Sequence, residues 1–303
     1  MYGRDVVEFP LPAAIDGRHL LALPQGTEVE GYAIAWFPAA SWDRHPVRET
    51  DTAGVPRLAG ARFRGMSSAP EARSGRLRLS DGAVLDGPYP VDAATARSIG
   101  LPARDVDVYG LDEPTGDGTL TTGWMEAVAR RAGGAVGGAH GAPWLLPDPG
   151  ALVDLALWTG VTVPAAELMP LVRPAFAGTR LGAVQPLPDR GAQAFTVTAE
   201  SDYDGALVLT AARPDEVPLA VAGTDWGRNG PWSYAVSWVP EDPFELEQEA
   251  PSRLHVIARS RMAPSIARAM ATLWRVAGGT VVDAAGFVVK PDELAARSST
   301  LGR

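Results

Sequence analysis

The amino-acid sequence contains a weak internal duplication, which constrains the fold more than any other feature because a repeated sequence implies a repeated structure. Its landmarks are two short segments, the end of a helical stretch, and a glycine with a short run of residues after it. In order, the matching pairs are 32–38 with 234–240, 105–109 with 253–257, Ala-Gly-Gly at 132–134 with 277–279, and Gly141 before 144–148 with Gly286 before 288–292. Four matches in the same order indicate two related units in tandem.

The periodicities inside each unit predict strands combined with helices. Segments Tyr32–Pro38 and Tyr234–Pro240 carry the aromatic and β-branched residues typical of strands. Alternation predicts another strand at 253–257 and at its counterpart, 105–109. One helix of the second unit has a single apolar stripe, made of Ile266, Met270, Leu273, Trp274 and Ala277. We therefore predict an α+β fold with two tandem, weakly similar units, each a mostly antiparallel sheet with helices on one face.

The two units are predicted to differ in length. We expect the first to span residues 1–185 and the second 191–303, with the link at a proline-containing stretch between them. The first unit carries a Gly/Pro/Arg-rich insertion at about 40–100 and an extra helical segment at 149–178.

Local signals predict helices within these extra segments. The insertion ends in a small helix that Asp92 can cap and Gly100 can end. In the segment 149–178 we expect two helices, Pro149–Trp158 and one that starts at Pro164.

Composition excludes several classes of protein. With 46% hydrophobic and 21% charged residues in 303 positions, the chain can bury a sizeable core, which excludes wholesale disorder. The absence of cysteine excludes disulfide scaffolds, zinc–thiolate sites, iron–sulfur clusters and thiol nucleophiles. The formal net charge of −9 argues against a general nucleic-acid binder.

The sequence also favours one compartment and one kind of genome. The N-terminal residues lack the basic and apolar pattern of a secretory signal, and no apolar run is long enough to cross a membrane. We therefore expect a soluble, cytoplasmic protein without membrane contact. Lys290 is the only lysine among 27 basic residues, a bias that indicates a GC-rich bacterial genome.

No local pattern predicts a metal or a cofactor. The four histidines lie too far apart for a local metal signature, although a catalytic triad assembled from distant residues stays open. The glycine-rich run 133–141 follows a helix, which indicates a helix end and not a phosphate-binding loop. Asp202–Gly205 resembles the start of a calcium loop, but Arg213 stands where a bidentate glutamate is needed. A hairpin turn explains the same residues.

One loop rich in tryptophan is the candidate binding site. Trp226, Arg228, Asn229 and Trp232 surround an Asn-Gly turn, and tryptophan and arginine are the side chains most enriched at binding hot spots. We therefore expect these four residues to bind a partner or a ligand. The alternative is that one or both tryptophans fold back over the sheet and cover the core.

A second candidate is a basic stretch. The segment from Arg44 to Arg78 holds eight arginines and three acidic residues, a net charge of +5 in a chain of net charge −9. Such a segment can dock an anionic partner or the acidic surface of its own chain. Solvated arginines on an ordinary loop are the simplest interpretation, and Phe63 is the only aromatic residue there that could stack on bases.

Together these features favour a non-catalytic binding or adaptor protein, whose partner is an unidentified protein or small molecule. The alternative is an enzyme or small-molecule-binding protein with a pocket between the two units, drawing on Trp226, Arg228, Trp232 and His255. A third hypothesis is anion or nucleic-acid binding through Arg44–Arg78. The sequence resembles no known family closely enough to transfer residues.

Overall fold

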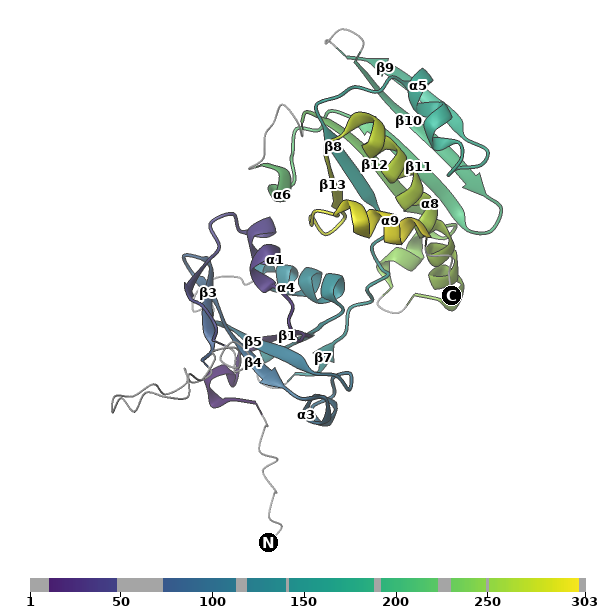
Figure 1. Cartoon of the computed structure of the whole chain (residues 1–303). Helices are drawn as coiled ribbons and strands as arrows, with labels where there is room; N and C mark the ends of the chain where they lie inside the picture. The colour runs from purple at the N-terminus through teal and green to yellow at the C-terminus, as the bar shows by residue number, and fades with distance from the viewer. Residues whose placement is uncertain are drawn as a thin grey trace, which may run out of the picture. The chain divides into compact units, whose positions relative to one another are not determined.

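The chain folds into two compact units, each built on one antiparallel sheet (Figure 1). The computed structural model describes residues 11–47, 73–112, 119–139, 142–187, 192–222, 230–248 and 251–299. The units are Met1–Pro149 and Gly150–Arg303. Within the described residues, the first sheet has seven strands and the second has six. The predicted α+β class, with two tandem sheet units, is therefore confirmed.

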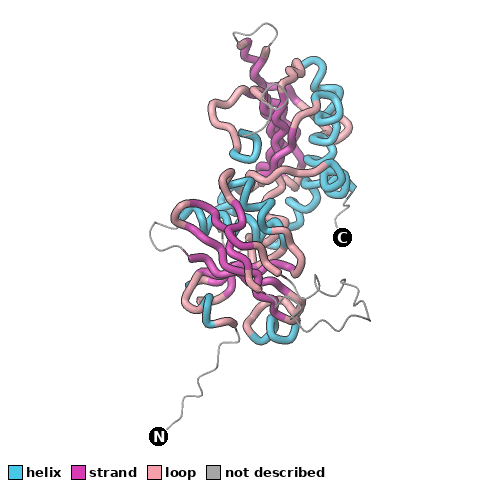
Figure 2. Tube along the Cα trace, turned by 60° about the vertical axis from the view of Figure 1, so that its left-hand side comes forward, coloured by secondary structure: helices cyan, strands magenta, loops and turns pink. Residues whose placement is uncertain are grey.

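In the first unit the longer helices share one face of the sheet. The elements are η1 (Ala13–Ile15), β1 (His19–Pro24), α1 (Val29–Trp36), β2 (Ser41–Arg44), β3 (Gly75–Ser80), β4 (Ala83–Val91), α3 (Ala93–Ser98), β5 (Val106–Asp112), α4 (Thr119–Ala132), β6 (Ala135–Gly137) and β7 (Trp144–Leu145). The strand order is β2-β3-β4-β5-β1-β6-β7. Helix α4 packs on β1 and β6, and α1 packs on β2 and β3. The short η1 and α3 lie on the opposite face (Figures 1 and 2).

In the second unit the longer helices again share one face. The elements are β8 (Leu155–Thr159), α5 (Ala165–Val172), β9 (Arg180–Pro186), β10 (Gln193–Ser201), β11 (Gly205–Ala212), α6 (Leu219–Ala222), β12 (Trp232–Val239), η3 (Pro243–Glu247), α8 (Arg253–Ala277), β13 (Thr280–Asp283) and α9 (Pro291–Ser299). The strand order is β13-β8-β12-β11-β10-β9. The short α6 packs on the other face, where Val221 contacts Trp158 and Val282.

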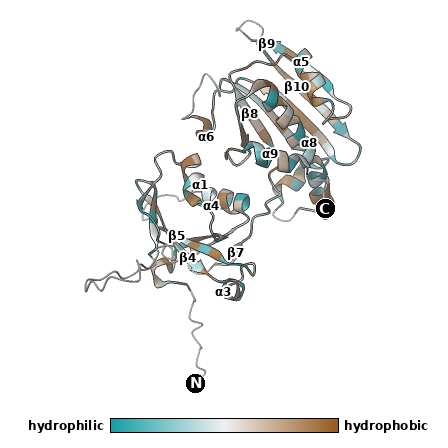
Figure 3. Ribbon diagram, viewed as in Figure 1, coloured by the Kyte–Doolittle hydropathy of each residue, from teal (hydrophilic) through white to brown (hydrophobic). Residues whose placement is uncertain are grey.

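The core of the second unit forms because the apolar stripe of α8 meets the alternating apolar residues of the strands. Ile266, Met270 and Leu273 are fully buried, and they share one core with Leu209 of β11 and Val236 of β12. Figure 3 shows hydrophobic residues along the strands beneath the helices. The predicted stripe on this helix is therefore confirmed.

The two units share one topology. Each runs strand, helix, four strands with a short helix between the last two, a long helix and a final strand. The sheet order β2-β3-β4-β5-β1-β6 of the first unit corresponds position by position to β9-β10-β11-β12-β8-β13 of the second. In both units the first strand therefore lies between the fifth and the sixth. This arrangement supports the duplication inferred from the sequence.

Two of the four sequence landmarks do not match in structure. Segment 32–38 was expected to be a strand, as 234–240 is in β12, but most of it belongs to helix α1. Segment 253–257 was expected to be a strand and instead starts helix α8, where Ser252 caps the helix by accepting a hydrogen bond from His255 N at 3.2 Å. Short apolar runs fit helix and strand equally, and tertiary packing decides between them.

The boundary between the units also differs from the expected one. The predicted helix at 149–158 is wrong, because Leu155–Thr159 forms strand β8 between β12 and β13. Helix α5 follows Pro164 as expected. Since β8, α5 and β9 belong to the second unit, the chain divides between Pro149 and Gly150 and not in the stretch 185–191.

Other local predictions are confirmed. Asp92 caps α3 by accepting a hydrogen bond from Thr95 N at 2.8 Å, and Gly100 follows that helix with a φ of +88°. Ser201 pairs with Gly205 across a hairpin between β10 and β11.

The predicted insertion at about 40–100 is wrong, because this region holds β2, β3, β4 and α3, the counterparts of β9, β10, β11 and α6 in the second unit. Most of the basic stretch Arg44–Arg78, residues 48–72, lies outside the described residues.

Candidate functional site

Of the four predicted binding residues, the structure describes only Trp232. Trp226, Arg228 and Asn229 lie outside the described residues. Trp232 starts β12 and is only 5% exposed, within the core of the second unit. This placement agrees with the alternative interpretation, in which a tryptophan packs over the sheet, and it leaves Trp232 without a surface for a partner.

His255 lies in the first turn of α8, in a partly apolar environment. Its ring packs edge-on against Trp238, with ring centroids 4.8 Å apart, and its Nδ1 is buried without a hydrogen-bond partner among the described residues. Burial lowers the pKa of His255 below its usual value, and Arg259 lowers it further, whereas Glu245 opposes both. The neutral ring is therefore the form that packs here.

We expect the folded second unit to lose stability in mild acid because of His255. Since folding lowers the pKa of this group, the unfolded chain takes up the proton first as the pH falls through the ordinary value of 6.5. For the wild type, the urea concentration at the midpoint of denaturation should be lower at about pH 5.5 than at about pH 7.5. It should fall less for His255→Gln. An equal fall in both proteins would contradict this role for His255.

Two described arginines of the basic stretch, Arg76 and Arg78, pair with acidic groups of their own unit. Asp86, nearly buried, accepts a hydrogen bond from Arg18 Nη1 at 2.7 Å and lies 3.5 Å from Arg76 Nη1. Arg78 Nη2 lies 3.3 Å from Asp43 Oδ1. These ion pairs link β3 to β4 and to β2 in the first sheet. Docking by the stretch as a whole stays a prediction.

The remaining motifs have structural explanations. The residues that resembled a calcium loop form the β10–β11 hairpin, where Arg261 Nη1 lies 3.4 Å from Asp204 Oδ1. In the glycine-rich run, Gly133 ends α4 with a φ of +68° and the chain re-enters the sheet as β6. Across the described parts of the chain, no three His, Asp or Glu side chains gather in a group that could hold a metal ion.

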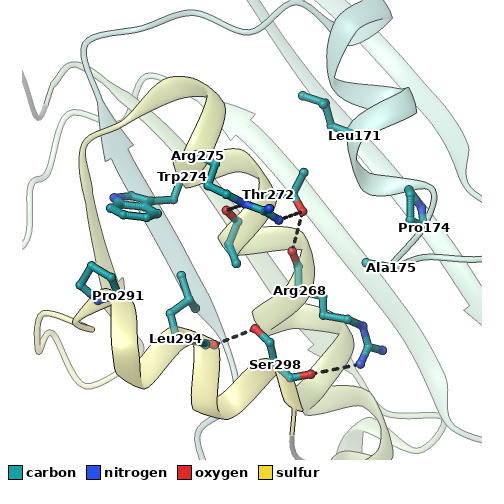
Figure 4. A pocket seen from close by; sticks show the side chains of 12 residues that line it. Leu171, Pro174, Ala175, Arg268, Thr272, Trp274, Arg275, Pro291, Leu294 and Ser298 are labelled. Atoms are coloured by element: carbon teal, nitrogen blue, oxygen red, sulfur yellow. Dashed lines mark hydrogen bonds between the residues drawn. The ribbon is translucent and has the colours of Figure 1, made fainter.

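A groove between three helices of the second unit is the feature with the chemistry of a binding site (Figure 4). It has a volume of about 480 Å³ and lies between α5, α8 and α9. Helix α5 contributes Leu171, and the small residues Ala271 and Ala295 come from α8 and α9. The lining residues are Leu171, Pro174, Ala175, Arg268, Ala271, Thr272, Trp274, Arg275, Pro291, Leu294, Ala295 and Ser298.

The groove is apolar along its length and carries two positive charges. Arg268 donates to Ser265 Oγ at 2.8 Å and to the Ser298 carbonyl at 3.4 Å. Arg275 donates to the Ala271 carbonyl at 3.1 Å and to Thr272 Oγ1 at 3.3 Å. Among the described residues, neither guanidinium lies within 4.0 Å of a carboxylate. Both side chains are exposed, so these charges can meet a carboxylate from outside.

Sequence reasoning missed this groove. It recognised the stripe of α8 as core, but Trp274 and the neighbouring Ala271 are only half-buried and line the opening. A faint signal was present, because Arg268 and Arg275 are seven residues apart and flank the apolar stripe on the same side of the helix.

Comparison with known proteins adds no functional assignment. No protein-family model matches the chain, and no curated protein or solved structure matches it either. Within the described ranges, none of the helices is long and apolar enough to cross a membrane. Fold and site together define an α+β protein of two tandem units with an open, positively charged groove on the second. The pocket expected between the units stays a prediction.

Proposed function

We propose that this chain is a non-catalytic binding or adaptor protein and that the groove between α5, α8 and α9 is its partner-binding site. One observation carries the proposal: an open apolar groove that also holds two arginines without carboxylate partners among the described residues. Apolar surface in a concave site favours burial of a ligand, and unpaired arginines select for acidic groups.

The chemistry of the groove specifies the kind of partner. Leu171, Trp274 and Pro291 offer apolar contacts to leucine-like or aromatic side chains. Arg268 and Arg275 are about 10 Å apart along α8, from a rise of 1.5 Å per residue. A partner that engages both arginines at once therefore presents apolar side chains and two carboxylates whose separation matches that of Arg268 and Arg275, about 10 Å. A short amphipathic segment of a protein, held as in helix-in-groove recognition, has this pattern.

A photo-crosslinking amino acid placed at Ala295 tests the proposal in cells of the native host. Ala295 lines the groove and is exposed, whereas its neighbour Ala296 is exposed but does not line the groove. We expect a defined adduct from position 295, little or none from position 296, and loss of the adduct in Arg268→Glu/Arg275→Glu.

Two results would count against a binding groove. One is the absence of any adduct from position 295. The other is an adduct whose yield is the same with and without the two arginines, because the charges would then play no part in recognition.

A further inference from the structure

The second unit exposes an acidic, apolar segment far from the groove. This acidic segment, residues 241–246, forms part of η3 and the turn before it. Phe244 is 72% exposed and Leu246 is 62% exposed, and they stand among Glu241, Asp242 and Glu245. Two large apolar side chains exposed within three residues of a described, hydrogen-bonded segment indicate a surface that another molecule covers.

Hydrogen bonds hold the acidic segment in place. Asp242 Oδ1 accepts a hydrogen bond from Phe244 N at 3.0 Å. Glu245 Oε2 accepts one from Ser252 N at 2.7 Å, which fixes the segment to the residue that caps α8. Because the segment is already ordered, binding it costs less conformational entropy than binding a flexible peptide would.

The acidic segment carries both kinds of group that the groove can bind, but its exposed carboxylates are on adjacent residues, Glu241 and Asp242, so they can pair with one arginine and do not span both. Phe244 and Leu246 supply the apolar side chains, and Glu241 and Asp242 supply exposed carboxylates. The groove supplies apolar walls and the guanidinium groups of Arg268 and Arg275. On this complementarity of charge and apolar surface, we propose that the acidic segment of one copy of the chain docks in the groove of a second copy.

The segment lies at the other end of α8 from the groove of its own chain. It is tied to the N-terminal end of α8 through Ser252, and the groove arginines lie 15 and 22 residues beyond Arg253 in the same continuous helix. At 1.5 Å per residue, these arginines are about 22 and 33 Å away along the helix axis. A second copy supplies the same segment without this restriction.

The two surfaces that meet are different parts of the chain. Two copies can therefore exchange segments reciprocally in a closed two-fold dimer, or associate head-to-tail into a ring or an open chain. The inference rests on the proposed function, since it names the occupant of the same groove.

Mixing two variants tests the contact directly by sedimentation velocity. A groove variant, Arg268→Glu/Arg275→Glu, keeps its acidic segment; a segment variant, Phe244→Ser/Leu246→Ser, keeps its groove. We expect concentration-dependent association of the wild type, at least about 30-fold weaker association of either variant alone, and a 1:1 dimer that does not grow further when the two are mixed. A wild type that stays monomeric, or either variant associating like the wild type, would overturn the inference.

Matched controls separate docking from changes in folding and net charge. Ala295→Trp fills the groove without changing charge and should also prevent association, whereas Ala296→Trp should not. Arg97→Glu/Arg180→Glu makes the same charge change at exposed residues that belong to neither the groove nor the acidic segment, and this variant should associate normally. If the wild type is monomeric but position 295 still crosslinks to a foreign protein, the self-docking inference fails and the proposed function stands. The absence of every adduct would remove the proposed function itself.

Discussion

Replacing Gly279 with alanine is expected to destabilise the second unit by about 3 kcal/mol or more. Gly279 ends the turn between α8 and β13 with a φ of +93°, which residues other than glycine rarely adopt. A Cβ at this position would collide with the carbonyl oxygen of Trp158 and would lie 2.9 Å from Thr159 Cβ. Both atoms belong to β8, which is paired on both sides, so neither can move without disturbing the pairing with β12 and β13.

The control for this substitution is another glycine with a positive φ. Gly178 has a φ of +70°, and a methyl group added there would meet no atom within 4 Å, so Gly178→Ala should cost only about 1–2 kcal/mol of backbone strain. Urea denaturation followed by far-UV circular dichroism measures both variants. Equal losses at the two positions would show that backbone conformation alone, and not the contact with β8, determines the cost.

Features controlled by neighbouring residues were predictable from the sequence. The stripe of α8, the Asp92 cap of α3 and the hairpin at Ser201–Gly205 all depend on residues within a few positions of one another. Their physical causes, helical periodicity, a carboxylate that accepts an N–H bond, and a glycine in a tight turn, can be read directly from the sequence. The overall α+β class followed from these local signals.

Features decided by distant contacts were not predictable. Leu155–Thr159 becomes strand β8 because β12 and β13 are placed on either side of it. Segment 32–38 becomes helix although its residue types suit a strand, since α1 packs on β2 and β3. In both segments the short apolar run left the secondary structure undetermined, and the surrounding elements settled it.

The groove was hidden for the same reason. Its lining comes from residues 171–175, 268–275 and 291–298, and no sequence pattern shows that these three segments meet. The charges of the acidic segment, in contrast, are plain in the sequence. Only the exposed positions of Phe244 and Leu246 make the segment a candidate docking surface. Composition therefore identified the charges, and tertiary structure showed which of them lie beside apolar surface.

Replacing Trp124 with alanine is expected to destabilise the first unit by about 3–5 kcal/mol. Trp124 lies on α4 and is fully buried; its ring meets Phe37 edge-on at 5.8 Å, and its indole N–H donates to the Tyr32 carbonyl at 3.0 Å. This one side chain therefore joins α4 to α1 over the sheet.

The substitution Trp124→Phe separates the two contributions of this side chain. Phenylalanine keeps most of the apolar contact with Phe37 but loses the donor to the Tyr32 carbonyl, so it should cost about 1–3 kcal/mol, less than alanine. Hydrogen exchange should show the loss in the amides of β1 and β6, on which α4 packs. Equal costs for phenylalanine and alanine would mean that the hydrogen bond to α1, and not the buried volume, holds the two helices together. Exchange that is unchanged in β1 and β6 would contradict the packing role of Trp124 altogether.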